Sequence, residues 1–292
     1  MKKRILVLGG TRYVGKRLVQ LFIDSGDAVT VGTRGKAPIS FSGEVSHVKL
    51  DRFDERSMRA ALARGEWDVV YDQQCYAPED AASAIEILKG RVRRYILCSS
   101  GIVYKNPLNA KEKLFDPLTY PVRFPGRENV DYGEGKRLSE AVLFQQGTFS
   151  SVSVRFPIIL GADDYTERLR VQVQRVARGR PVKVVNPDAK ISLISSDEAA
   201  SFLGWLSRVH FTGPFNACST GSIALGEIVT LIEEATGKVA TVRTQPGDQA
   251  MSLFWARSSF TLSAARAQYC GFPFFRVRDW LPSLVQEEAT LL

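Results

Sequence analysis

The stretch from Ile5 to Gly15 constrains the fold of this chain more than any other. Residues 5–8 are four consecutive apolar residues without polar alternation, as is typical of a strand buried on both faces. Glycines follow at once, and apolar residues then recur at the spacing of one helix face: Val14, Leu18, Leu21 and Phe22. The stretch therefore predicts a strand, a tight glycine turn and a helix, in that order.

The turn has the chemistry of a dinucleotide-binding turn. Gly9 and Gly10 can adopt positive φ, and Gly15 lacks the Cβ that would hold the helix away from the strand. Unpaired N–H groups at the start of the helix favour a diphosphate. Glycines also serve ordinary strand-to-helix corners, but the order strand, turn, helix favours the dinucleotide. We therefore expect cofactor contacts along the whole turn: Gly9, Gly10, Thr11, Arg12, Tyr13, Val14 and Gly15.

Length and composition agree with a globular protein. The chain has 292 residues, of which 45% are hydrophobic and 24% charged, enough for one large core and a smaller lobe. No run approaches the roughly 18 apolar residues of a membrane span. The four apolar residues after Arg4 are too few for a signal peptide. We therefore expect a cytoplasmic protein without a membrane partner.

Neither the cysteines nor the net charge indicates a metal site, a disulfide framework or a nucleic-acid partner. Cys75, Cys98, Cys218 and Cys270 lie far apart without a CxxC pair, which favours neither a metal site nor a disulfide framework. The net charge of +8 comes from scattered basic residues, which most often form a solvated face and less often attract anionic substrates. Nucleic acid is the third interpretation, and we do not expect it as a partner.

Strands and helices alternate along the first half of the chain. Apolar runs predict strands over residues 28–31, 46–50, 67–72, 95–98 and 152–156, and helical spacing predicts helices over residues 57–63, 78–89 and 132–146. This alternation predicts an α/β fold with a doubly wound parallel sheet and right-handed crossovers. Because ligands bind at the carboxyl ends of such strands, we expect cofactor contacts from Asp51, Arg52 and Gln73.

The residues after the second strand bear on the choice between NAD and NADP. A carboxylate there would bind the ribose 2′-hydroxyl of NAD, whereas an arginine accommodates the 2′-phosphate of NADP. The stretch from Gly32 to Lys36 contains Arg34 and no carboxylate. We therefore expect NADP rather than NAD, with Arg34 as the phosphate ligand. The alternative is that Arg34 is an ordinary surface residue.

Two later segments carry groups that suit proton transfer. The strand over residues 95–98 runs into Ser99 and Ser100. A later helix opens with Tyr132 and Lys136, which are neighbours because positions i and i+4 share a helical face. We expect both side chains to point roughly away from the apolar face of that helix. Between the two segments, residues 106–127 are rich in proline and lack periodicity, which favours a substrate-binding loop.

A tyrosine beside a lysine can act as an acid and base at neutral pH. A free phenol titrates near pH ~10, and a neighbouring ammonium and a positively charged nicotinamide both favour the phenolate. Tyr132 can then exchange a proton with a substrate hydroxyl or carbonyl group, while Ser100 hydrogen-bonds to the same oxygen and the nicotinamide exchanges hydride. A YxxxK spacing alone often arises by chance. Together with the dinucleotide turn it favours Ser100, Tyr132 and Lys136 as catalytic residues, with Ser99, Tyr132 and Lys136 near the cofactor.

These residues resemble a known enzyme family. Residues 9–15, Ser100 four positions before Tyr104, and the pair of Tyr132 and Lys136 resemble the extended short-chain dehydrogenases/reductases of the NAD-dependent epimerase/dehydratase type, over nearly the whole chain. The resemblance implies a Rossmann domain that binds a nicotinamide dinucleotide. It also implies that the segment around Pro157 lines the nicotinamide, with Pro157 as a cofactor contact.

Two positions depart from the usual pattern of that family. Arg12 stands where a middle glycine is usual, a variant that resembles a branch with chloroplast RNA-associated members. Gly101 and Ile102 follow Ser100, where the family's dehydratases carry an acidic pair that eliminates water. The second departure disfavours a sugar dehydratase and leaves an epimerase or a carbonyl reductase.

The rest of the chain resembles the family's smaller substrate lobe. We expect the Rossmann domain over residues 1–160 with a return segment at about 190–220, and an interleaved lobe over residues 161–292. A basic helix is expected over residues 163–179, and its arginines suit either a diphosphate or a solvated face. A later helix to Val209 is expected to be capped by Ser196 or Asp197.

We therefore predict an NAD(P)-dependent oxidoreductase or epimerase that moves hydride between nicotinamide and a secondary alcohol or ketone of a nucleotide sugar. One alternative is an NADPH-dependent carbonyl reductase of a non-sugar metabolite, which would agree better with Arg34. Another is a nucleotide- or RNA-binding protein without catalysis, against which the set of Ser100, Tyr132 and Lys136 stands. The resemblance also implies a homodimer formed through the helix that carries Tyr132.

Overall fold

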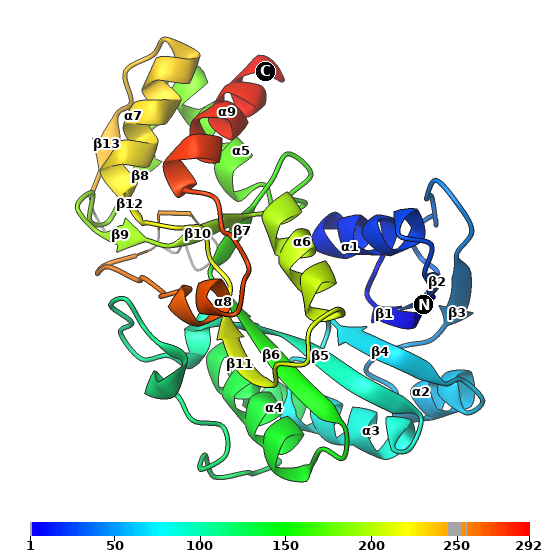
Figure 1. The fold of residues 1–292 in the computed structure, drawn as a ribbon. Coiled ribbons are helices and arrows are strands. Elements are labelled where there is room, and N and C mark those ends of the chain that lie inside the picture. Colours follow the sequence, from blue (N-terminus) through cyan, green and yellow to red (C-terminus); the bar gives the residue numbers. More distant parts are fainter. Residues whose placement is uncertain (1, 245–252, 255) are drawn as a thin grey trace. The chain divides into compact units, whose positions relative to one another are not determined.

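The computed structural model describes residues 2–244, 253–254 and 256–292, and it contains a seven-stranded sheet (Figure 1). The strands follow the order β11-β6-β5-β4-β1-β2-β3, and every neighbouring pair is parallel. The prediction of an α/β fold with a doubly wound parallel sheet is confirmed. The strands are β1 (Arg4–Leu8), β2 (Ala28–Thr33), β3 (Ser46–Lys49), β4 (Trp67–Asp72), β5 (Val92–Ser100), β6 (Ser150–Phe156) and β11 (Gly213–Asn216).

Helices cover both faces of this sheet (Figure 1). One face carries α2 (Glu55–Leu62), α3 (Pro78–Leu88) and α4 (Tyr132–Gln146), and the other carries α1 (Tyr13–Asp24) with residues 200–206 of α6 (Ser196–Leu206). Strand β1 lies between β2 and β4, and its four apolar residues are 0% exposed. Its side chains alternate between the two faces, and both faces are covered by helices, which is why residues 5–8 are all apolar.

Helix α1 packs on the sheet by a stripe that differs slightly from the predicted one. Val14, Leu18, Val19 and Phe22 are buried, whereas Leu21 is 39% exposed. At 100° per residue, Leu21 lies roughly a quarter turn from the centre of the buried stripe. The prediction that Leu21 belongs to the buried face was wrong.

The structure also differs from the prediction at two helix starts. Helix α5 (Arg168–Ala177) begins at Arg168 rather than at residue 163, because residues 161–167 form turns closed by bonds from Asp164 N to Gly161 O and from Glu167 N to Asp164 O. Helix α6 begins at Ser196, so its cap is Ser195, whose Oγ accepts from Glu198 N at 3.1 Å. The predicted caps, Ser196 and Asp197, lie one and two positions too late.

The chain divides into two compact units. The first comprises Met1–Tyr104, Glu112–Phe156 and Ala200–Asn216 and holds the seven-stranded sheet. The second comprises Lys105–Lys111, Pro157–Ala199 and Ala217–Leu292. Besides α5, its elements are β7 (Ile158–Leu160), β8 (Val182–Lys183), β9 (Lys190–Ile191), β10 (Leu193–Ser195), β12 (Ile223–Ala224), α7 (Leu225–Thr236), β13 (Val242–Arg243), α8 (Ala265–Tyr269) and α9 (Val277–Thr290).

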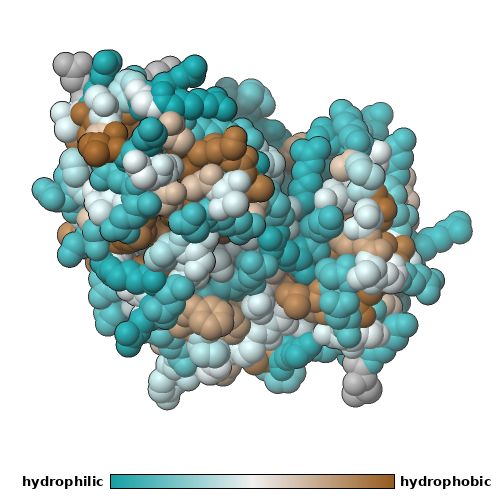
Figure 2. All heavy atoms as spheres, turned by 90° about the horizontal axis from the view of Figure 1, so that it is seen from above, coloured by the Kyte–Doolittle hydropathy of each residue, from teal (hydrophilic) through white to brown (hydrophobic). Residues whose placement is uncertain are grey.

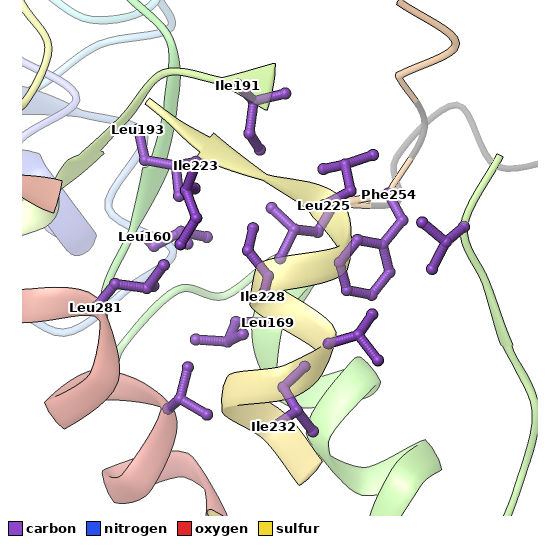
Figure 3. Close-up of a cluster of buried hydrophobic side chains, with 14 of the residues drawn as sticks. Leu160, Leu169, Ile191, Leu193, Ile223, Leu225, Ile228, Ile232, Phe254 and Leu281 are labelled. Atoms are coloured by element: carbon purple, nitrogen blue, oxygen red, sulfur yellow. The ribbon is translucent and has the colours of Figure 1, made fainter. Parts of the chain in front are cut away.

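The second unit has an apolar core of its own. Figure 3 shows Leu169 of α5, Ile228 of α7 and Leu281 of α9 directed toward one another, with Leu160 of β7 beside them. Each of these four side chains is at most 4% exposed. Three helices and short strands therefore share one buried cluster.

A carboxylate is buried in the second unit. Glu198 is 3% exposed, and its oxygens accept hydrogen bonds from Ser219 Oγ and Phe275 N. Burial raises the pKa of Glu198, although both hydrogen bonds oppose the rise. The folded state therefore favours the protonated carboxyl more than the unfolded chain does.

We expect Glu198→Gln to weaken the dependence of stability on pH. Because the folded pKa is raised, protonation contributes stability that is fully present below the unfolded value and is lost as pH rises through the folded value. The amide does not ionise, so the free energy of unfolding of the variant should fall less than that of wild type as pH rises from about 4 to 7.

Urea unfolding followed by tryptophan fluorescence measures this difference. Glu234→Gln, on the same unit but exposed, is the matched control and should follow wild type at every pH. Identical pH dependence of wild type and Glu198→Gln would contradict the prediction.

The surface is mixed in polarity. In the face drawn in Figure 2, hydrophilic side chains prevail and hydrophobic ones form several smaller groups. Within the described ranges, no helix combines the length and the apolar character that crossing a membrane requires.

Candidate functional site

The glycine turn between β1 and α1 forms a close-packed cradle. Gly9 has a φ of +93°, a conformation that favours glycine. A Cβ on Gly15 would lie 2.5 Å from the carbonyl oxygen of Gly9, and one on Gly10 would lie 2.7 Å from Val19 Cγ2. A side chain at any of these positions would force the turn apart, so the cradle requires its glycines.

The start of α1 leaves backbone donors available. Its N-cap, Arg12, makes no side-chain cap hydrogen bond, and the first turn contains no acidic residue. Arg12 is exposed, and the next residue, Tyr13, has a φ of 51°. Such a helix start favours an anion, because uncapped N–H groups and the helix dipole both attract negative charge.

Two glutamines after β4 border the same turn. Gln74 Cγ lies 3.0 Å from the position of a Cβ on Gly9, and Gln73 Nε2 lies 2.8 Å from that of a Cβ on Gly15. Gln73 Nε2 is buried and has no hydrogen-bond partner among the described residues. A buried donor without an acceptor, beside a glycine cradle and an uncapped helix start, fits the diphosphate of a dinucleotide.

The residues expected around the adenosine differ in their exposure. Arg34 follows β2 and is exposed, and Asp51 is half-buried. Arg52, in contrast, is 3% exposed, and its Nε and Nη2 donate to Asp72 Oδ2 at 2.9 and 2.5 Å. The guanidinium of Arg52 is therefore engaged in an internal ion pair, which the sequence prediction missed.

Asp72 organises the turn that follows β4. Its Oδ2 accepts from Arg52 and from the Tyr95 hydroxyl, and its Oδ1 accepts from Gln74 N at 3.0 Å. Burial raises the pKa of Asp72, but the charge of Arg52 and the hydrogen bonds that the carboxylate accepts together outweigh burial, so the pKa is lowered. The charged carboxylate therefore fixes the backbone of the turn that carries Gln73 and Gln74.

Ser100 is the last residue of β5, so it lies at the carboxyl end of that strand, on the same edge of the sheet as the turn after β4. Ser100 Oγ accepts from Ile102 N at 3.3 Å and so caps the short helix η1 (Gly101–Val103). Its hydroxyl proton has no acceptor within the described part of the chain and can donate to a ligand. Ser99 differs, because its hydroxyl is buried and donates to Glu140 Oε1.

Helix α4 brings Tyr132 and Lys136 together. Asp131 caps the helix, since its Oδ1 accepts from Glu134 N at 2.8 Å, and α4 begins at Tyr132. Tyr132 is 52% exposed. Lys136 Nζ lies 5.6 Å from the centroid of the Tyr132 ring. The ammonium is therefore close to the phenol ring.

Lys136 does not point away from the buried side of α4, as the sequence analysis expected. It is 1% exposed, and its Nζ donates to the carbonyl oxygens of Cys75 and Cys98 at 2.7 Å each. Cys75 follows β4 and Cys98 lies on β5, so one ammonium joins the ends of two neighbouring strands. These contacts between distant segments hold the lysine inward.

Gly135 allows the turn after β4 to reach α4. A Cβ on Gly135 would overlap the carbonyl oxygen of Tyr76, the residue after Cys75. A Cβ on Gly133 would lie no closer than 3.3 Å to its neighbours. The two glycines of this helix turn therefore differ in how tightly they are enclosed.

We expect Gly135→Ala to destabilise the first unit by about 1–3 kcal/mol, because a methyl group must push the Tyr76 backbone aside. Gly133→Ala gains the same helix propensity without that overlap, so it should be neutral or stabilising. Thermal unfolding measures both. Equal thermal unfolding midpoints for the two variants would contradict the prediction that a methyl group on Gly135 overlaps the Tyr76 backbone.

A buried ion pair anchors α4 to β6 and to the long loop. Arg155 and Glu140 are both 0% exposed and meet at 2.6 Å. Arg155 also donates to the carbonyl oxygens of Glu112 and Phe115, each within 3.0 Å, and to Tyr104 Oη. Burial opposes the charge of Arg155, but Glu140 outweighs it and raises the pKa of the guanidinium.

The long loop over residues 106–127 contains one short helix, and its later part lies against α4. Residues 105–111 belong to the second unit, whereas η2 (Glu112–Leu114) and the segment after it belong to the first. Glu134 of α4 accepts from the Tyr120 hydroxyl and from Arg123 Nη2, and Gln145 Nε2 donates to the carbonyl oxygens of Pro117 and Tyr120. Residues 115–123 therefore cover the outer side of α4. The homodimer expected through α4 stays a prediction.

Two further expected sites lie in the second unit. Pro157 begins the second segment of that unit, directly after β6. Of the α5 arginines, Arg170 pairs with Glu288 at 2.7 Å, and Arg175 donates to the carbonyl oxygen of Pro181. Arg170 therefore does not offer a free guanidinium to a diphosphate.

Comparison with known proteins identifies relatives over most of the chain. A model of the NAD dependent epimerase/dehydratase family matches residues 5–208. Chloroplast stem-loop binding protein of 41 kDa b from Arabidopsis thaliana is 30% identical over 225 residues, which cover 71% of this chain and 56% of that protein. The chain thus spans little more than half the length of that relative. UDP-glucuronic acid decarboxylase 1 from the same plant is 25% identical, over 97% of this chain and 69% of that protein.

A solved structure shares the fold over nearly the whole chain. UDP-glucose 4-epimerase from Thermus thermophilus, in complex with NAD, matches with a TM-score of 0.75 and 18% identity, over 99% of this chain and 100% of that one. At this identity the likeness shows the fold alone.

Proposed function

The chain belongs to the NAD-dependent epimerase/dehydratase family, and on that premise we propose that it moves hydride between a nicotinamide cofactor and a secondary alcohol or ketone of a nucleotide sugar. The match to the family supports the cofactor class. The names of two relatives, a UDP-glucose 4-epimerase and a UDP-glucuronic acid decarboxylase, support the substrate class.

One observation carries this proposal. The ammonium of Lys136 lies 5.6 Å from the Tyr132 ring and is held by carbonyl oxygens at the ends of β4 and β5. Ser100 ends β5, two residues after Cys98. Ligands bind at the carboxyl ends of parallel strands, so these positions support a shared role for the Tyr132 phenol, the Lys136 ammonium and the Ser100 hydroxyl.

Each of the three groups has a role in a proton transfer. The bound nicotinamide would accept hydride from the substrate carbon or return it. Tyr132 takes the proton of the substrate hydroxyl at its phenol oxygen, or gives it back to the carbonyl oxygen. Ser100 donates a hydrogen bond to that same oxygen, and the ammonium of Lys136 lies beside the Tyr132 ring.

The dinucleotide would lie along the carboxyl ends of β1, β2, β4 and β5. Residues 9–15 and Gln73 would hold the diphosphate, Asp51 and the backbone of Arg52 the adenosine, and Ser99, Tyr132, Lys136 and Pro157 the nicotinamide half. Arg34 is exposed directly after β2, and residues 32–36 contain no carboxylate. We therefore propose NADP as the better ligand, with NAD as the alternative.

The residues after Ser100 narrow the reaction. Gly101 and Ile102 carry no side chain that could remove or add a proton. An epimerase or a reductase needs only the three groups already described, whereas elimination of water needs a further acid and base. We propose one of the first two reactions rather than a dehydration.

Cofactor content and substrate conversion test the proposal together. Nucleotides released from denatured protein would be identified, and folded protein would be incubated with UDP-glucose and UDP-glucuronic acid and with NAD, NADP and NADPH. Dinucleotide binding with conversion of a UDP sugar supports the proposal. Absence of binding at millimolar NAD and NADP overturns it. Oxidation of NADPH by a simple ketone alone favours the carbonyl reductase.

A specific observation also favours a second candidate, an RNA-binding protein. The relative that is 30% identical is named a stem-loop binding protein, and this chain has a net charge of +8. Filter binding of an RNA hairpin between 50 and about 200 mM salt tests it, because phosphate contacts weaken steeply over this range. RNA retained at the higher salt by a protein that binds neither NAD nor NADP would support this candidate and reject the first.

A further inference from the structure

Three neighbouring aromatic rings include that of Tyr132, a member of the proposed catalytic pair. The Tyr76 ring centroid lies 6.0 Å from that of Phe53 and 6.2 Å from that of Tyr132. All three side chains are partly exposed, at 43% for Phe53, 38% for Tyr76 and 52% for Tyr132. The middle ring, Tyr76, was not among the residues that the sequence singled out.

The backbone of Tyr76 is fixed from two sides. Its N–H donates to Asp80 Oδ2 at 2.8 Å, and Arg127 binds the same carboxylate. Its carbonyl oxygen lies where a Cβ on Gly135 would be, one position before Lys136. The backbone of Tyr76 is therefore held against α4, next to the helix turn that carries Lys136.

The Tyr76 ring lies over the ammonium of Lys136. Nζ is 4.7 Å from the ring centroid of Tyr76 and 5.6 Å from that of Tyr132, while two carbonyl oxygens bind it from the protein interior. Lys136 is 1% exposed although both tyrosines are partly exposed, so the rings lie between the ammonium and solvent.

We propose that Tyr76 is a positioning residue that shields the Lys136 ammonium from water and keeps it beside Tyr132. The role in turnover rests on the proposed function, whereas the shielding does not. An aromatic face attracts a cation, and excluding water strengthens the effect of that cation on a neighbouring phenol. Without the ring, water reaches the ammonium and weakens its influence on Tyr132.

Labelling of Lys136 tests the shielding without any substrate. Folded protein is treated with formaldehyde and cyanoborohydride, and methylation of Lys136 is quantified by peptide mass spectrometry. Tyr76→Leu and Tyr76→Met both remove the ring and should label Lys136 about tenfold faster than wild type, because a cation–π contact of this kind is lost. Tyr76→Phe keeps the ring and should label as wild type does.

Phe53→Leu is the matched control for loss of an exposed aromatic ring. It removes the other neighbour of Tyr76, and the structure records no contact of Phe53 with Lys136 among the described residues. It should leave Lys136 labelling unchanged. Wild-type labelling in both Tyr76→Leu and Tyr76→Met, with thermal unfolding showing that either is folded, overturns the proposal.

Turnover supplies a second readout. With the UDP sugar that wild type converts, Tyr76→Leu should lower kcat about tenfold with KM within threefold, and Tyr76→Phe should restore kcat. If no UDP sugar is converted by wild type, the proposed function fails while the labelling result still decides on the shielding. Unchanged kcat with faster labelling would confine Tyr76 to shielding and reject its role in positioning.

Discussion

Tyr132→Phe should lower turnover of the nucleotide sugar by about two to four orders of magnitude, because it removes the group that transfers the proton. The change is confined to one hydroxyl. The ring remains, with its contact to Tyr76 at 6.2 Å, and a side chain that is 52% exposed contributes little to the core. Dinucleotide affinity and the unfolding midpoint should therefore stay near the wild-type values. Initial rates, calorimetric titration with NAD and NADP, and thermal unfolding measure the three quantities.

Tyr269→Phe is the matched control for this substitution. Tyr269 lies in the second unit and is 94% exposed, so deleting its hydroxyl should change none of the three quantities. Turnover by Tyr132→Phe within tenfold of wild type would contradict the catalytic role. Loss of turnover together with loss of cofactor binding would assign Tyr132 to binding instead.

Arg155→Met should destabilise the first unit by about 3–5 kcal/mol, because it leaves a buried carboxylate without its cation. Glu140 is 0% exposed and would keep only the hydrogen bond from Ser99 Oγ. The carbonyl oxygens of Glu112 and Phe115 would also lose their donor. Hydrogen exchange of the β5 and β6 amides under increasing denaturant measures this loss within the first unit.

The double variant Arg155→Met with Glu140→Leu separates charge burial from packing. Replacing both partners by apolar groups removes the unpaired charge, so the double variant should be more stable than Arg155→Met alone. A single variant within about 1 kcal/mol of wild type would contradict the importance of this pair.

Local patterns were sufficient for most of the fold. The apolar run of β1, the glycine turn and the limits of β4 and α4 depend on residues close in sequence, and the structure has them where the sequence predicts. The errors lie at element ends. Ser195, the last residue of β10, caps α6 in place of Ser196. Helix α5 starts late because turns over residues 161–167 take the place of its first turn.

The candidate site could be predicted only in part. The YxxxK spacing correctly places Lys136 near Tyr132, but helix periodicity could not predict that Cys75 and Cys98 hold the ammonium inward. The pair of Arg52 and Asp72 was missed for the same reason, since it joins the turn after β3 to the end of β4. A charged residue ending the buried strand β4 was the available signal. The roles of Ser100, Tyr132 and Lys136 remain predictions.

The loop that covers α4 bears on how this chain can assemble. Tyr120, Pro117 and Arg123 already satisfy polar groups of Glu134 and Gln145, so another molecule at this helix would first have to displace them. A contact within one chain forms in a unimolecular step, and its occupancy does not depend on protein concentration. Residues 115–123 therefore still cover α4 at protein concentrations so low that an assembly of subunits would dissociate.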